Sequence, residues 1–236
     1  MRFKLNNNPY NEPIDLYEKS TEYVTLKPGV TILVGPNGIG KTSFIDSLEV
    51  YLMHKQKYFK FDNLMNGGNN MNQSLLDIGN ISGLATNIRS SEGENILNNI
   101  GIVGKDISRY IYKYEVNYKY CSTTRNAPKK DTNKRFILLD AIDSGLSIDG
   151  IIQIKDFMNF IIEDAADNKP ELDIYIIISS NSYEMTNGMR CMDVRTCKEI
   201  SFETYDDFKE FIIKSNEKKL ERYNKINEII DNQKEE

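Results

Sequence analysis

The stretch GVTILVGPNGIGKTSF, residues 29–44, constrains the fold more than any other part of the chain. Val30 to Val34 form a run that is apolar except for Thr31, which is typical of a buried parallel strand. A glycine-rich turn follows, and Phe44, Leu48 and Leu52 then recur at helical spacing. The order of strand, turn and helix predicts one unit of an α/β domain.

The turn matches the pattern G-x-x-x-x-G-K-[ST] in full. Its residues are Gly35, Pro36, Asn37, Gly38, Ile39, Gly40, Lys41 and Thr42, with Ser43 next in the chain. Glycines let the backbone curl so that several N–H groups point at phosphate oxygens, and the helix expected from Lys41 adds a partial positive charge. We therefore expect a nucleotide site, with Lys41 at the β- and γ-phosphates and the Thr42 hydroxyl on Mg²⁺. The alternative is a glycine-rich turn without a ligand, and no residue here selects ATP over GTP.

A second apolar run, FILLD, ends at Asp140. Proteins with a phosphate loop need a second anion that holds Mg²⁺, and it lies at the end of a neighbouring hydrophobic strand. Asp140 fits this role and is the predicted metal residue. The alternative is an aspartate that merely caps its strand.

Strand and helix patterns alternate along the rest of the chain. DIYIIISS predicts a third buried strand, residues 147–166 a helix, and MRCMDVRTCKEISF a hairpin that turns near Thr196. Residues 91–114 favour two helices broken near Gly101–Gly104. This alternation predicts an α/β fold with a mostly parallel central sheet flanked by helices.

The length of 236 residues suits one large domain, which we assign to residues 1–213, with a small helical insert at about 62–134. The C-terminus is predicted to be helical from Tyr205, and residues 214–236 form an exposed charged tail. The net charge of −5 excludes a global basic field for nucleic acid but leaves room for a local basic patch.

Three cysteines, Cys121, Cys191 and Cys197, lack metal-ligand spacing and are expected to be reduced thiols of a cytoplasmic protein. No run approaches the roughly 18 apolar residues of a membrane span, so we expect no membrane association.

GPNGIGKT, followed far along the chain by FILLDAIDSGLS, resembles the ABC-type ATPase heads of the SMC, RecF and AAA-domain group of DNA-repair and phage ATPases. The resemblance implies a P-loop NTPase that binds ATP and Mg²⁺ and forms a homodimer around shared ATP sites. SMC-type proteins insert a long coiled coil between these motifs. Too few residues separate Thr42 from Phe136 for such an insertion, so this would be a head without a coil.

The resemblance also implies a signature loop that binds the γ-phosphate held by the opposite protomer. RSSEGENIL offers Ser91, Gly93 and Glu94 for this loop. A hydroxyl and backbone N–H groups at a helix start form an anion site. The alternative is a helix cap in which Ser91 and Glu94 make a capping box.

Three further positions follow from the resemblance. Ser144–Ser147 is similar to the loop that touches the partner across the dimer, and Asn181 stands where the family usually carries a switch histidine. Gln73 is the candidate for the family's metal-binding glutamine. The chain's only histidine, His54, is expected to be a surface or packing residue.

One departure bears on the chemistry, because Ala141 follows Asp140 where the family carries a catalytic glutamate. Either Asp143 orients the attacking water with help from Asn181, as glutamine does in GTPases, or hydrolysis is very slow and ATP holds two protomers together. A turn-forming role for Asp143 is equally compatible with the sequence.

The sequence is therefore compatible with two alternative functions. The first is a slow, ATP-dimerised ATPase serving DNA replication, recombination or repair, with DNA or a DNA-processing protein as partner. The second is a catalytically weak, nucleotide-gated module that controls a partner such as a nuclease. Local support for DNA is limited to two basic groups, Lys129, Lys130, Lys134 and Arg135 in one and Lys218, Lys219 and Arg222 in the other.

Tyr10, Tyr17 and Tyr23 are candidates either for stacking on the nucleotide base or for packing.

Overall fold

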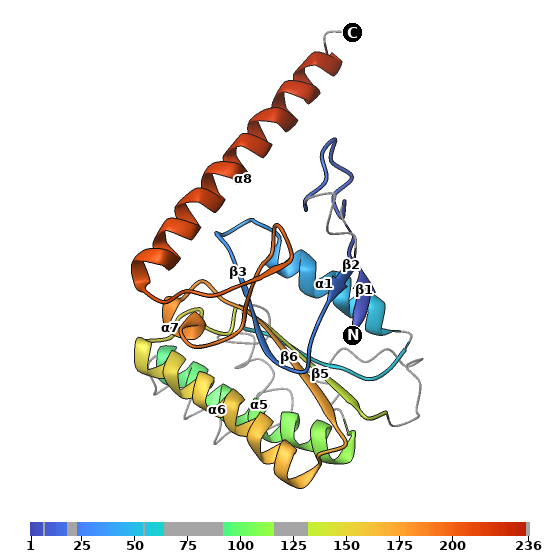
Figure 1. Cartoon of the computed structure of the whole chain (residues 1–236), viewed down its shortest axis with the longest axis vertical. Helices are drawn as coiled ribbons and strands as arrows, with labels where there is room; N and C mark the ends of the chain where they lie inside the picture. The colour runs from blue at the N-terminus through green and yellow to red at the C-terminus, as the bar shows by residue number, and fades with distance from the viewer. Residues whose placement is uncertain (7, 18–22, 54, 64–91, 116–131, 235–236) are drawn as a thin grey trace.

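A central sheet runs through the computed structural model, which describes residues 1–6, 8–17, 23–53, 55–63, 92–115 and 132–234, with the backbone alone for 92–102 (Figure 1). The strands pair in the order β4-β5-β6-β3-β7-β8. They are β4 (Phe59–Asp62), β5 (Lys134–Asp140), β6 (Asp173–Ser179), β3 (Gly29–Val34), β7 (Cys191–Asp193) and β8 (Lys198–Ile200). All neighbours are parallel except β7 and β8, so the predicted mostly parallel α/β fold is confirmed.

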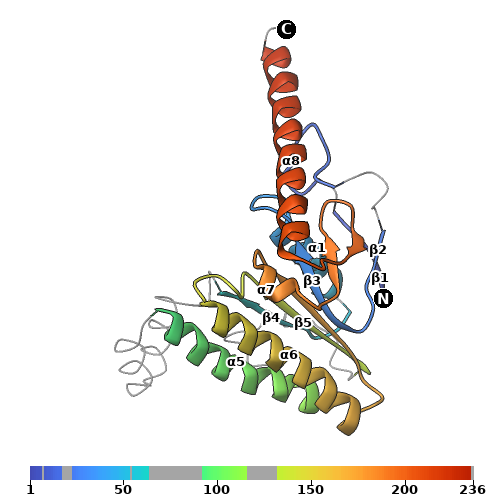
Figure 2. The same cartoon turned by 60° about the vertical axis from the view of Figure 1, so that its left-hand side comes forward.

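Helices cover both faces of this sheet. They are α1 (Lys41–Met53), α5 (Glu92–Lys113), α6 (Ile148–Asn168) and the short α7 (Tyr183–Thr186). The first turns of α8 (Tyr205–Lys234) pack on the main core, and the rest of this helix extends away from the sheet (Figure 1). The helix α1 packs on one face together with a small hairpin of β1 (Arg2–Lys4) and β2 (Tyr23–Thr25). Helices α5 and α6 lie side by side on the other face (Figures 1 and 2).

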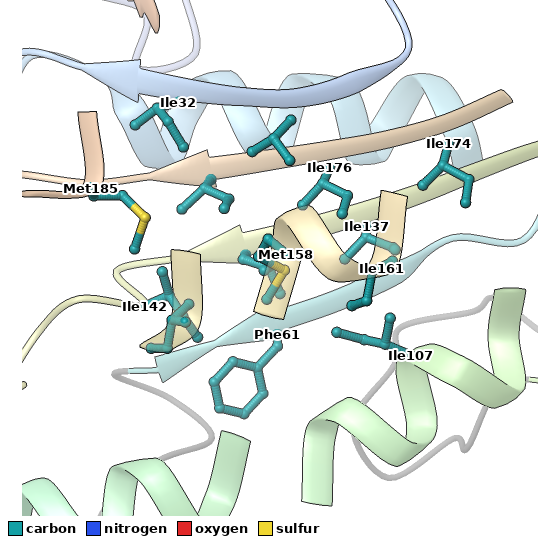
Figure 3. Close-up of a cluster of buried hydrophobic side chains, with 14 of the residues drawn as sticks. Ile32, Phe61, Ile107, Ile137, Ile142, Met158, Ile161, Ile174, Ile176 and Met185 are labelled. Carbon is teal, nitrogen blue, oxygen red and sulfur yellow. The ribbon is translucent and has the colours of Figure 1, made fainter. Parts of the chain in front are cut away.

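The strand β5 contains an apolar run in which polar and apolar residues do not alternate. Phe136 and Leu138 point to the α1 face, where Phe136 stacks on Tyr175 with ring centroids 4.6 Å apart. Ile137 and Leu139 point to the α5 and α6 face, where the cluster of isoleucines in Figure 3 lies. Because both faces are buried, every position from Phe136 to Leu139 is apolar.

The predicted break near Gly101–Gly104 is wrong, because α5 is one continuous helix. A Cβ atom on Gly104 would lie 2.8 Å from the Phe157 ring of α6. The glycine therefore permits the close approach of two helices. Tertiary packing has overridden the low helix propensity of glycine at this position. As part of the layer over β4 and β5, α5 contributes Ile107 and Tyr110 to the main core.

The C-terminal helix is longer and less isolated than a free tail. α8 runs without interruption from Tyr205 to Lys234. Phe208 packs into the core, and Ser215 and Ile226 are also buried. The expected exposed tail after Lys214 is exposed at most positions, although Ser215 and Ile226 are buried and Arg222 contacts the N-terminal segment.

The predicted hairpin near Thr196 is confirmed by the antiparallel pair β7 and β8. The short elements β1, β4 and α7 had no clear pattern in the sequence.

Among the described residues, no helix combines the length and apolar content that crossing a bilayer requires.

Candidate nucleotide site

The carboxyl ends of β3, β5 and β6 open into one cleft of about 490 Å³. Open α/β sheets bind ligands at this edge. The strand β6 lies between β3 and β5, so the residues after β6 sit between the phosphate loop (residues 35–42) and Asp140. The cleft is lined by Tyr10, Glu12, Leu16, Asn37, Gly38, Gly40, Lys41, Thr42, Ser43, Asp140, Ala141, Ser144, Ser179, Asn181, Arg222 and Tyr223.

The phosphate loop leads directly into the first turn of α1. Gly40 has φ 105°, and a Cβ atom there would lie 2.8 Å from the Leu16 side chain. The amide of Phe44 donates to the Gly40 carbonyl at 2.9 Å and closes the first helical turn. The N-terminus of a 13-residue helix therefore faces the cleft, where its free N–H groups favour an anion.

Lys41 is buried at the centre of this loop. Its Nζ donates to the carbonyls of Gly35 at 2.6 Å and Pro36 at 3.2 Å, and to Oδ1 of Asn181 at 2.7 Å. Burial lowers the pKa of Lys41 to about 8, against the opposing effect of the Asp143 and Asp140 carboxylates. The lysine thus lacks a direct anionic partner among these contacts, and a phosphate beside it would favour the protonated form.

Asp140 and Thr42 both line the cleft, and their carboxylate and hydroxyl oxygens are ligand types that suit Mg²⁺. Asp140 is 4% exposed, and its Oδ1 accepts a hydrogen bond from the Ser179 hydroxyl. Ser179 Oγ in turn accepts from the Ala141 amide at 2.8 Å. Thr42 is exposed at the start of α1. A carboxylate and a hydroxyl leave the remaining positions of a magnesium ion to phosphate and water, so the chain's residues fit this metal.

Ala141 adopts a left-handed backbone with φ 50° immediately after Asp140. Its carbonyl accepts from the Ser144 amide at 3.0 Å and from Nδ2 of Asn63 at 3.2 Å. The same Asn63 amide group donates to the Ser144 carbonyl at 2.9 Å. The methyl side chain of Ala141 cannot orient water. Asn63, the residue after β4, stabilises the turn through its two hydrogen bonds.

Asp143 binds the loop that follows β6. Its Oδ2 accepts from the Ser180 hydroxyl at 2.7 Å, from the Asn181 amide at 2.8 Å and from the Ser182 amide at 3.1 Å. This geometry gives Asp143 a structural role in holding the loop after β6, rather than its own turn, and it also positions the backbone of Asn181. A role for Asp143 in orienting water stays a prediction.

Other predicted residues divide between the cleft and the core. The Ile39 side chain is buried in the α1-side core, so only its backbone is available to a ligand. The Ser43 hydroxyl lies 2.6 Å from the Tyr10 hydroxyl, and Tyr10 is exposed on the cleft. Tyr17 is buried, and its hydroxyl donates to the Gly40 carbonyl at 2.9 Å, so it packs beneath the loop. Tyr23 is exposed on β2, beneath the guanidinium of Arg2.

The signature-loop prediction lies largely outside what the structure describes. Ser91, Gln73 and His54 are not among the described residues. Gly93 and Glu94 belong to the first turn of α5, where the backbone alone is described.

Sequence reasoning missed several residues of the cleft. Ser179 had a signal, because it ends a strand next to Asp140. No sequence signal pointed to the cleft residues Glu12, Arg222 and Tyr223, or to Asn63, which holds the turn after Asp140. Their positions depend on how distant segments pack.

A parallel sheet with a glycine-rich phosphate loop, a buried lysine and an acidic residue on a nearby strand defines a P-loop NTPase. A family model described as an AAA domain matches residues 12–236. The chain belongs to this AAA-domain family, which implies ATP binding and usually Mg²⁺. Among curated proteins, no match to the chain is found.

Proposed function

We propose that this protein is an ABC/SMC-head-like ATPase that dimerises around ATP and hydrolyses it slowly, in the service of DNA replication, recombination or repair. The observation that carries the proposal is the cleft in which Lys41 and Asn181 are joined beside Asp140, while Ala141 occupies the position next to that carboxylate.

The proposed roles follow from the contacts. The N–H groups of the phosphate loop bind the β- and γ-phosphates, and Lys41 exchanges the carbonyls of Gly35 and Pro36 for phosphate oxygens. Thr42 and Asp140 would hold Mg²⁺, which would neutralise charge on the phosphates. The backbone N–H of Asn181 donates to Asp143, which fixes the position of the residue. Its side-chain amide would then face the attacking water.

Slow turnover is expected from the residues next to Asp140. The side chain of Ala141 offers no acceptor for a proton of water, and its carbonyl is already bound by Ser144 and Asn63. One carboxylate oxygen of Asp143 already accepts three hydrogen bonds, which competes with a catalytic role. Catalysis would then rest on positioning and charge stabilisation, with Asn181 and the second carboxylate oxygen of Asp143 as the groups that could orient the water.

Dimerisation is proposed from the resemblance in the phosphate loop, the signature-like Ser91-x-Gly93-Glu94 and the loop Ser144–Ser147. In that loop Gly145 and Ser147 are exposed beside the cleft and available to a second copy. ATP shared between two protomers would stabilise the dimer by mass action. The head is assigned to residues 1–213, with 214–236 as a helical extension.

A second candidate function is a nucleotide-gated module that controls a partner such as a nuclease. The engaged carboxylate of Asp143 and the methyl group of Ala141 favour it. The two candidates separate on turnover, because a module binds ATP tightly and releases essentially no phosphate over many cycles.

The proposal is tested by multiple-turnover phosphate release with Mg-ATP from the wild type, Asp143→Ala and the blank Lys41→Ala. Light scattering with and without ATP reports the oligomeric state in parallel. Turnover above the blank, together with an ATP-dependent dimer, supports the ATPase. ATP binding without turnover favours the gated module, and ATP binding without a change in mass contradicts the dimer.

The DNA role has its own measurement, which is phosphate release with and without duplex DNA at low salt. Stimulation or direct binding supports it. Unchanged turnover and no binding would remove it while leaving the ATPase intact.

A further inference from the structure

The helix α8 lies against the phosphate loop and the N-terminal segment of its own chain (Figure 2). Arg222 donates to the carbonyls of Asp15 at 3.1 Å and Ile14 at 2.9 Å, and it forms an ion pair with Glu12. Lys219, one helical turn earlier, donates through Nζ to the carbonyl of Asn37 at 3.0 Å. Arg222 and Tyr223 of this helix line the nucleotide cleft, and Lys219 lines the neighbouring cavity beside the phosphate loop.

Two lysines from different elements consequently bind consecutive carbonyls of the phosphate loop. Lys41 binds those of Gly35 and Pro36, and Lys219 binds that of Asn37. Two like charges at one loop repel each other, and a polyanion bound there would relieve that repulsion.

We propose that Lys219 is a second phosphate-binding lysine, supplied by α8 in cis, that contacts the terminal phosphate of the nucleotide. This inference rests on the proposed ATP site. Lys41 of this motif reaches the β- and γ-phosphates, and Lys219 occupies the neighbouring carbonyl at the same end of the loop. A cation supplied in cis at a terminal phosphate stabilises the charge that phosphoryl transfer develops.

Arg222 and Lys219 have different roles in the contact between α8 and the rest of the chain. Arg222 is held by Glu12 and by two backbone carbonyls, so its guanidinium fixes α8 against the N-terminal segment. Lys219 has a flexible stem, is half-buried and binds a neutral carbonyl that it can exchange for a phosphate oxygen. A cavity of about 720 Å³ between α8 and the N-terminal segment is lined by both residues and by Gly38 of the loop.

Lys218 is the matched control that the chain itself provides. It carries the same charge, lies on the same helix and lines the same neighbouring cavity. It is exposed, and among the described residues no hydrogen bond joins it to the phosphate loop. Loss of Lys218 therefore reproduces the change in net charge without the contact.

The test is the calorimetric affinity of Mg-ATP and Mg-ADP for the full chain carrying Lys219→Gln, Lys219→Arg, Lys218→Gln or Lys41→Ala. Lys219→Gln is expected to weaken ATP about tenfold or more, the loss of one charge-assisted hydrogen bond, and to weaken ADP much less. Lys219→Arg is expected to restore most of the preference for ATP. Lys218→Gln is expected to leave both affinities unchanged.

Each other outcome identifies what has failed. Equal weakening of ATP and ADP by Lys219→Gln would make the lysine a support of the loop and overturn the inference. Equal behaviour of Lys219→Gln and Lys218→Gln would overturn it as well. If Lys41→Ala binds ATP as the wild type does, the proposed ATP site itself fails. Thermal unfolding midpoints of all variants show that the folded state is being compared.

Discussion

Nζ of Lys41 lies 2.7 Å from Oδ1 of Asn181, which joins the phosphate loop to the segment after β6 across 140 residues of sequence. The ammonium group and the amide oxygen face each other inside the cleft. A nucleotide must share this lysine with Asn181, so the side chain at position 181 controls how available the lysine is.

Asn181→Asp is therefore expected to weaken ATP binding about tenfold, because a carboxylate would pair with Lys41 and repel the phosphates. Fluorescence titration with a labelled ATP measures the effect. Asn187→Asp, an exposed asparagine at the end of α7, is the control and should bind ATP as the wild type does. Unchanged affinity in Asn181→Asp would mean that the Lys41 contact has no part in binding.

Asp143→Ala is expected to lower the free energy of unfolding by about 2 kcal/mol, because Ser180 Oγ and the amides of Asn181 and Ser182 lose their shared acceptor. Urea denaturation measures this. Asp167→Ala, at an exposed position near the end of α6, should change stability by less than about 0.5 kcal/mol. Equal stability of both variants would argue against a structural duty for Asp143.

Gly40→Ala is expected to destabilise the fold and to abolish nucleotide binding. Position 40 has φ 105°, and the added methyl would meet the Leu16 side chain at 2.8 Å. Gly188→Ala is a matched control, because Gly188 also has a positive φ, 71°, but no atom lies within 4 Å of the added Cβ. It should cost only backbone strain, about 1 to 2 kcal/mol, and keep ATP affinity. Thermal unfolding and an ATP titration compare the two.

Gly104→Ala tests the contact between α5 and α6. In an open helix this change stabilises by about 0.5 to 1 kcal/mol. Here we expect destabilisation, because the new methyl would lie 2.8 Å from the Phe157 ring. The double variant Gly104→Ala with Phe157→Leu should recover part of the loss in a double-mutant cycle of urea denaturation. A stabilised single variant would show that the ring moves aside freely.

Local patterns were sufficient for the strands β3, β5 and β6 and for the phosphate loop and Asp140. The run Val30–Val34, the phosphate loop and the helix from Lys41 lie in one short segment, and their physical causes are local. Asp140 was predictable because it ends an apolar strand. These features follow from periodicity and from glycine geometry, which a single sequence contains.

Features that depend on distant packing were not predictable in the same way. Gly101–Gly104 indicated a break, since nothing in the sequence reveals that Phe157 passes close to Gly104. The hydrogen-bond partners of Asp143 lie 37 to 39 residues away, on the loop after β6, and the sequence does not indicate where that loop passes. The basic stretch at Lys218 and Lys219 was interpreted as a charge run, and only the fold brings Lys219 to Asn37.

The contact between Arg222 and Glu12 joins residues 210 positions apart. A ribosome adding about 5 to 20 residues per second needs about 10 to 40 s to cover that interval. The phosphate loop is therefore synthesised early, whereas the contacts that α8 makes with it form only after the final helix has been synthesised. Nascent chains at the intermediate stage carry the loop without Lys219 or Arg222, so the contacts of α8 with the phosphate loop and with the N-terminal segment form late in biosynthesis.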